Sequence, residues 1–133
     1  MTTIRANKFV LEDQGGKPRA ILNADENGSG LVLYDKKGKN RAMLNLFKEM
    51  PTLSLSDENG KVRAALSAAK ELPALLLSDE DGRTRAVLDV NRDGPTLNLL
   101  DEKGKIRAIM SVDKDGPALI MLDENGTTVW RFP

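Results

Sequence analysis

The same pattern of residues begins again every 22 positions along this chain. Residues 97–118, LNLLDEKGKIRAIMSVDKDGPA, show the unit clearly. Six copies follow one another without insertion or deletion, the last of them cut short, and they begin at Phe9, Leu31, Leu53, Leu75, Leu97 and Leu119. The chain is therefore predicted to be a repeat array. Such regularity encodes an architecture and leaves little sequence free to encode chemistry.

Each copy contains two short stretches in which apolar and polar residues alternate, which is the period-2 pattern of strands. The two stretches are separated by Asp-x-x-Gly, as at Asp101 to Gly104. The carboxylate can accept hydrogen bonds from the turn's amides and the glycine tolerates a positive φ, so a four-residue hairpin loop is predicted. The same device followed by proline, as at Asp113 to Pro117, is predicted to reverse the chain again.

These signals predict an all-β fold of six sequential 22-residue β-hairpin repeats, forming an antiparallel meander that curls on itself. A flattened β-solenoid is the alternative. In a solenoid, equivalent arginines would stack at the strand spacing of about 4.8 Å, whereas a meander separates these like charges by two strands. The meander is therefore favoured. Residues 9–133 are predicted to form a single repeat domain, and residues 1–8 an N-terminal segment outside the repeat register.

Alternation also assigns the side chains to two faces. One face is apolar in every copy and is predicted to be the core; in one copy it comprises Leu97, Leu99, Ile106, Ala108, Met110 and Val112. A column of alanines at the position of Ala108 indicates a tight interior, and Trp130 and Phe132 are predicted to fill its open end.

The opposite face is half polar but still carries many apolar side chains: Val10, Ile21, Val32, Tyr34, Met43, Leu76, Val87, Leu100, Ile109, Ile120 and Leu122. Apolar exposure on this scale is rare in a soluble monomer, so we expect a homo-oligomer. Two connections, 47–51 and 69–73, replace the Asp and Gly by apolar residues. These two loops are predicted to fold over a sheet edge, with an intermolecular contact as the alternative.

The composition argues against most catalytic chemistry. The chain has no cysteine and no histidine, which removes thiolate ligands, the commonest general base and the commonest metal ligand. Residues 89–94, DVNRDG, match the first half of a calcium loop, but the twelfth position holds Leu100 in place of the bidentate glutamate. No enzyme activity, metal site or cofactor is expected.

One basic column is a candidate binding site for a polyanion. It consists of Arg19, Arg41, Arg63, Arg85 and Arg107. The adjacent loops hold equal numbers of acidic residues and no aromatic column interleaves with the arginines, so local ion pairing is favoured and nucleic acid is not expected. A glycan or another polyanion is the alternative ligand.

The consensus L-x-L-x-D-x-x-G-K-x-R-A resembles a short repeat found in many uncharacterised prokaryotic proteins, over Phe9 to Pro133. The resemblance implies no particular activity. The unit size is also similar to that of MORN and choline-binding repeats, whose defining aromatic residues are missing here. The sequence holds neither a signal peptide nor an apolar run of about 18 residues, so a cytoplasmic protein without membrane contact is expected. The predicted function is a structural or assembly module that self-associates, with a carbohydrate- or polyanion-binding module as the alternative.

Overall fold

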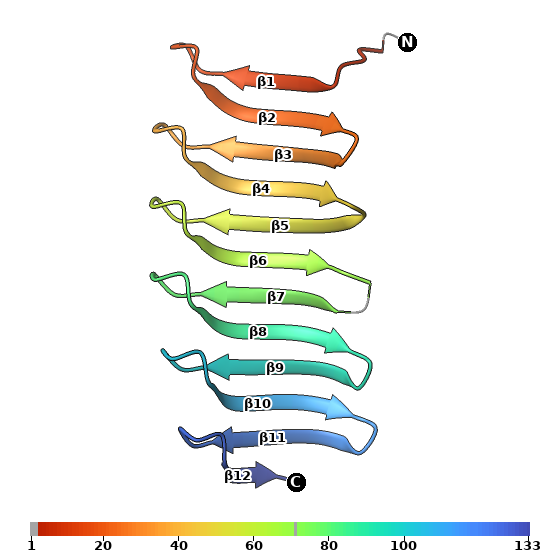
Figure 1. Cartoon of the computed structure of the whole chain (residues 1–133), viewed down its shortest axis with the longest axis vertical. Coiled ribbons are helices and arrows are strands. Elements are labelled where there is room, and N and C mark those ends of the chain that lie inside the picture. Colours follow the sequence, from red (N-terminus) through yellow and green to blue (C-terminus); the bar gives the residue numbers. More distant parts are fainter. Residues whose placement is uncertain (1–2, 71) are drawn as a thin grey trace.

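The computed structural model describes residues 3–70 and 72–133 and places twelve strands in one antiparallel sheet (Figure 1). The strands are β1 (Lys8–Glu12), β2 (Pro18–Asp25), β3 (Gly28–Tyr34), β4 (Asn40–Phe47), β5 (Met50–Ser56), β6 (Val62–Ala68), β7 (Pro73–Ser78), β8 (Thr84–Asn91), β9 (Gly94–Leu100), β10 (Ile106–Asp113), β11 (Gly116–Leu122) and β12 (Thr128–Phe132). The described residues contain no helix, and hence none long and apolar enough to cross a membrane.

The order of the strands in the sheet is their order in the chain, and each strand pairs only with its sequence neighbours. The predicted all-β hairpin meander is therefore confirmed. The sheet is open rather than closed into a barrel, because β1 and β12 lie at its opposite ends (Figure 1). A solenoid would stack equivalent strands in parallel, and this arrangement does not occur in the described sheet.

The Asp-x-x-Gly turns lie in a column along one margin of the sheet (Figure 1, left). In the turn between β9 and β10, the Gly104 amide donates to the Asp101 carbonyl at 3.0 Å and the Asp101 amide to the Lys105 carbonyl at 2.9 Å. The Asp101 carboxylate accepts hydrogen bonds from the amides of Lys103 and Lys105. Gly104 has a φ of 77°, which explains the glycine at this position.

A β-bulge follows each of these turns and changes the predicted register. Leu100 lies opposite Ile106 and Leu99 lies opposite Ala108, so Arg107 is the extra residue on its strand. The predicted four-residue loop would have placed Leu99 opposite Ile106. The actual offset of two residues keeps Ala108 and Met110 on the predicted face, since side chains alternate with period 2. Ile106, however, shares the opposite face with Leu100, and its predicted placement was wrong.

The connections at the other margin are tighter. Asn91 pairs with Gly94 across a two-residue loop, and Phe47 pairs with Met50 in the same way. In the latter loop both central residues, Lys48 and Glu49, have positive φ values of 47° and 65°, as in a type I′ turn.

The apolar loop tips do not fold over the sheet. Phe47 and Met50 in the first loop and Leu72 in the second are about half exposed, so the prediction that these loops cover an edge was wrong. Glu71, which belongs to the second loop, lies outside the described residues.

The sheet is a single layer, and this overturns the predicted core. Among the described residues only Ala74 is buried. Leu99, Met110 and Val112, which were predicted to be interior, are each close to half exposed. The sequence pattern identifies the apolar face correctly, but none of the residues that the structure describes packs against that face.

Candidate functional site

The register gathers apolar side chains into three rows that run across the strands on one side of the sheet. The first row consists of Phe9, Leu22, Leu31, Leu44, Leu53, Leu66, Leu75, Leu88, Leu97, Met110, Leu119 and Phe132. The second row consists of Leu11, Ala20, Leu33, Ala42, Leu55, Ala64, Leu77, Ala86, Leu99, Ala108, Met121 and Trp130. The third row contains the pairs Leu46–Pro51, Ala68–Pro73, Val90–Pro95 and Val112–Pro117.

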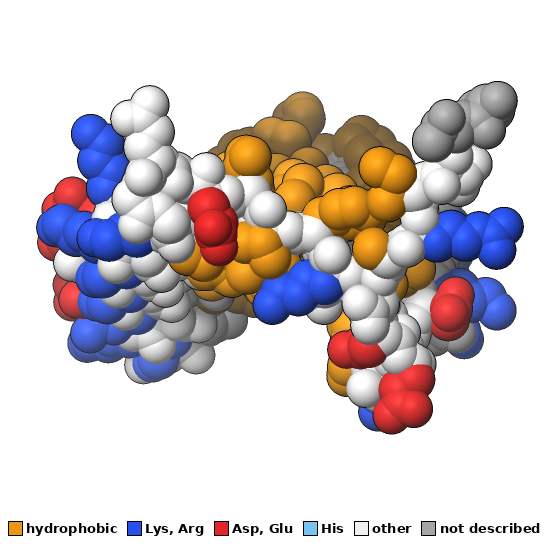
Figure 2. Space-filling model, turned by 90° about the horizontal axis from the view of Figure 1, so that it is seen from above, with side chains coloured by type: hydrophobic (Ala, Val, Ile, Leu, Met, Phe, Trp, Pro, Cys, Tyr) orange, Lys and Arg blue, Asp and Glu red, His pale blue; other side chains and the backbone are white. Residues whose placement is uncertain are grey.

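We call these three rows the apolar face and the other side of the sheet the mixed face. The apolar face holds no charged residue, and its large side chains stand well out of the sheet: Met110 is 55% exposed and Leu88 is 47% exposed. Figure 2, which looks along the sheet, shows hydrophobic side chains over the middle of the slab and Lys and Arg in a column at one margin. The apolar face is therefore an extended, uncovered hydrophobic surface.

The mixed face is less exposed than its sequence suggests. Apart from Val10, the apolar side chains predicted there are half-buried, including Met43, Val87 and Ile109. Polar side chains bond to one another on this face, as Thr52 does to Asn45. The side chains that most need a covering partner are thus those predicted to be the core, and not those predicted to form the oligomer contact.

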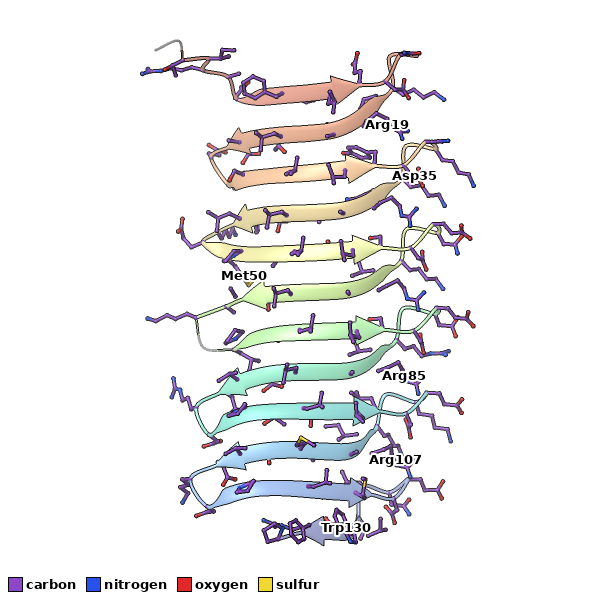
Figure 3. All side chains as sticks on the ribbon, turned by 180° about the vertical axis from the view of Figure 1, so that it is seen from behind. Arg19, Asp35, Met50, Arg85, Arg107 and Trp130 are labelled. Carbon is purple, nitrogen blue, oxygen red and sulfur yellow. The ribbon has the colours of Figure 1, made fainter. Side chains whose placement is uncertain are left out.

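The predicted basic column lies at the turn margin, where Arg19, Arg85 and Arg107 line up (Figure 3). Arg19 pairs with Asp13 of its own turn at 3.9 Å. The later arginines pair in the same way with Asp35, Asp57, Asp79 and Asp101, at distances of 3.3 to 3.6 Å. The favoured prediction of local ion pairing thus matches the contacts of these side chains.

Four of the arginines make a second contact that sequence reasoning missed. The Nε atoms of Arg41, Arg63, Arg85 and Arg107 donate at 2.9 Å to the carbonyl of the residue 15 positions later, which is Ser56, Ser78, Leu100 or Leu122. That carbonyl lies at the end of the following strand, next to the following turn. Each of these arginines therefore ties its own turn to the next hairpin, an arrangement that we call the arginine clasp.

In two repeats a lysine makes a further link to the next turn. Lys61 Nζ donates to the Glu80 carbonyl at 2.9 Å and Lys105 Nζ to the Glu124 carbonyl at 2.8 Å. The sequence holds one signal for these links between repeats, because the arginine recurs at the same position in five successive copies and is replaced by Val129 in the sixth. The side chains of the basic column thus have a structural use in joining successive repeats.

A shallow groove of about 430 Å³ runs between the last two Asp-x-x-Gly turns and is lined by both signs of charge, including Arg85, Asp101, Lys105, Arg107 and Glu124.

No cluster of three or more acidic, histidine or cysteine side chains able to hold a metal ion occurs in residues 3–70 and 72–133. In the predicted half calcium loop, the Asn91 side chain accepts hydrogen bonds from the amides of Asp93 and Gly94. Its oxygen is thus used in the turn.

The turn aspartates are held in the charged form. At Asp101, the hydrogen bond from the Lys105 amide is the main cause of a lowered pKa, with the Lys103 amide and the Arg107 guanidinium lowering the pKa further against partial desolvation. The pKa is lowered from its ordinary value at all six of these residues: Asp13, Asp35, Asp57, Asp79, Asp101 and Asp123.

We therefore expect the protein to lose stability in acid. A carboxylate whose pKa is lower in the folded state stabilises the fold fully above its unfolded pKa of about 3.9, and the contribution disappears as the pH falls through the folded value. In urea unfolding at several pH values, Asp101→Asn should be less stable than the natural chain at pH 7 and should approach its stability near pH 2. Glu102→Gln is the control, and a constant gap between Asp101→Asn and the natural chain at all pH values would contradict the expectation.

Comparison with protein families and with curated proteins finds no match for this chain. The resemblance to prokaryotic hairpin repeats stays a prediction.

Proposed function

We propose that this chain is a structural module without catalytic activity and that it works by self-association into a homo-oligomer. The observation that carries the proposal is the exposed area. The chain exposes 9,928 Å², whereas a compact monomer of 14.6 kDa would expose about 6,900 Å². About 3,000 Å² more than usual is therefore available for contacts with other molecules.

The repeats support the same proposal. The arginine clasps join successive hairpins at equal distances, which favours a regular slab over a shaped pocket. The groove between the turns is open and is lined by charges of both signs rather than by a set of groups that converge on one point. Stable domains normally bury the apolar side of a sheet against a second layer. A sheet with almost no interior of its own is suited to acquiring that layer by assembly.

Light scattering at micromolar concentration tests the proposal. We expect a mass that is a multiple of 14.6 kDa. A mass near that of one chain, from a sample that circular dichroism shows to be folded, would contradict the proposal.

Binding of a polyanion at the arginine column is the second candidate. It is supported by the exposure of the arginine side chains, since those of Arg63, Arg85 and Arg107 are each 41% exposed. Retention on heparin at low salt, lost in Arg85→Gln and kept in Arg92→Gln, would favour this candidate. Each arginine of the column already has a carboxylate partner, which is why the structural role comes first.

A further inference from the structure

The apolar face limits the kind of surface that can cover it. Its three rows contain no charged side chain, and any charged or strongly polar group placed against them would lose its water without gaining a partner. The partner surface must therefore be apolar, about as long as the sheet, and flat on the scale of a side chain. The apolar face of a second copy has these properties.

The size of the face agrees with a stable pair. Twelve strands at about 4.8 Å and three rows about 17 Å wide give about 1,000 Å² per copy, or about 2,000 Å² buried in total. Specific protein interfaces of standard size bury about 1,600 Å² in total. One copy of this chain is therefore enough to cover the face of another.

The second row provides places for the partner's side chains. Ala64 lies directly opposite Leu55 on one neighbouring strand and Leu77 on the other, and these leucines are 47% and 46% exposed. The same alternation repeats along the row, so each alanine leaves a hollow between two larger projecting side chains, which are leucines except for Met121 beside Ala108. Side chains from a facing sheet can enter such hollows, as they do when two sheets pack about 10 Å apart.

Charge does not oppose the pairing. The chain has 20 basic and 20 acidic residues, so two copies carry no net charge that would keep them apart. The charged side chains lie outside the three rows, and most of them lie in the turns at the margins, where they can stay in water. A two-fold axis through the face would present the same rows to one another from both copies.

We propose that two copies of this chain pack apolar face to apolar face and form a two-layer β-sandwich. The inference rests on the proposed function and names its partner and its contact. It also places that contact on the face that the sequence pattern had suggested to be the core.

Two neighbouring residues of β8 provide a matched test. Leu88 lies on the apolar face and Val87 on the mixed face. In light scattering, the natural chain should have twice the mass of one chain, Leu88→Lys should fall to about 14.6 kDa, and Val87→Lys should keep the doubled mass. A natural chain that is monomeric overturns the proposed function as well. An oligomer that Val87→Lys dissociates, or that Leu88→Lys leaves intact, overturns only the face-to-face pair.

A second measurement avoids charged substitutions that could unfold the sheet. The chain has no cysteine, so Met110→Cys and Lys103→Cys each carry a single thiol. We expect a maleimide to label the cysteine at position 110, on the apolar face, at least tenfold more slowly than the one at position 103 in a turn. The difference should shrink as the protein is diluted to the monomer. Equal labelling rates in a sample of doubled mass overturn the inference.

Discussion

Gly94→Ala is expected to destabilise the sheet by about 3 kcal/mol or more. Gly94 has a φ of 132°, and holding an L-residue in such a conformation costs of the order of 1 to 3 kcal/mol. A methyl group there would also lie 2.0 Å from the Val112 carbonyl oxygen, far inside van der Waals contact. That oxygen belongs to the end of β10, so the added atom would push apart two neighbouring strands.

Gly116→Ala is the matched control for this prediction. Gly116 occupies the same place in the next repeat and has a φ of 116°, but nothing lies within 4 Å of an added methyl group because the neighbouring strand, β12, ends at Phe132. It should therefore lose only the backbone contribution, about 1 to 3 kcal/mol. Gly28→Ala should resemble Gly94→Ala, since its methyl group would lie 1.8 Å from the Leu46 carbonyl oxygen. Equal midpoints of urea unfolding for Gly94→Ala and Gly116→Ala would show that the close approach of the strands relaxes at little cost.

Local chemistry explains why the strands and turns could be predicted from the sequence. The period-2 alternation that predicts a strand and the Asp-x-x-Gly motif that predicts a turn each depend on a few neighbouring residues, and the structure has both the strands and the turns. The bulge at Arg107 was missed because the turn extends one residue beyond Gly104: the Asp101 amide donates to the Lys105 carbonyl and the Asp101 carboxylate accepts from the Lys105 amide. The arginine contacts are not its cause, since the same bulge occurs at Val129 after the last turn. The bulge and the longer loop together shift the register by two residues. The side chains of Ala108 and Met110 therefore stay on the predicted face, and only that of Ile106 lies on the other face.

The core was mispredicted for a different reason. Alternation reports which side of a strand is apolar, but it does not report what covers that side. Leu99 and Met110 have the pattern of interior residues, and in one chain both remain exposed. Small residues such as Ala64 were interpreted as a sign that neighbours leave no room. The register shows that the neighbours are half-exposed leucines, so the space above the alanine is open in a single chain.

Ala64→Trp is expected to weaken association strongly while leaving the single chain folded. The row that contains Ala64 already ends in a tryptophan, Trp130, which is partly exposed beside Met121. An indole at position 64 would fill the hollow between Leu55 and Leu77 and stand in the way of a facing sheet. Overpacking of this kind costs about 1 to 3 kcal/mol, which corresponds to roughly a fivefold to 150-fold increase in the dissociation constant of the pair.

Ala65→Trp carries the same substitution one residue along β6, on the mixed face, where Ala65 lies opposite Ser54 and Leu76. Masses measured over a dilution series should give a raised dissociation constant for Ala64→Trp and an almost unchanged one for Ala65→Trp, with similar circular dichroism for both. If Ala64→Trp instead lowers the unfolding midpoint of the monomer and leaves the dissociation constant unchanged, the alanine row packs within one chain. The hollows on the apolar face would then not be the places where a second copy inserts its side chains.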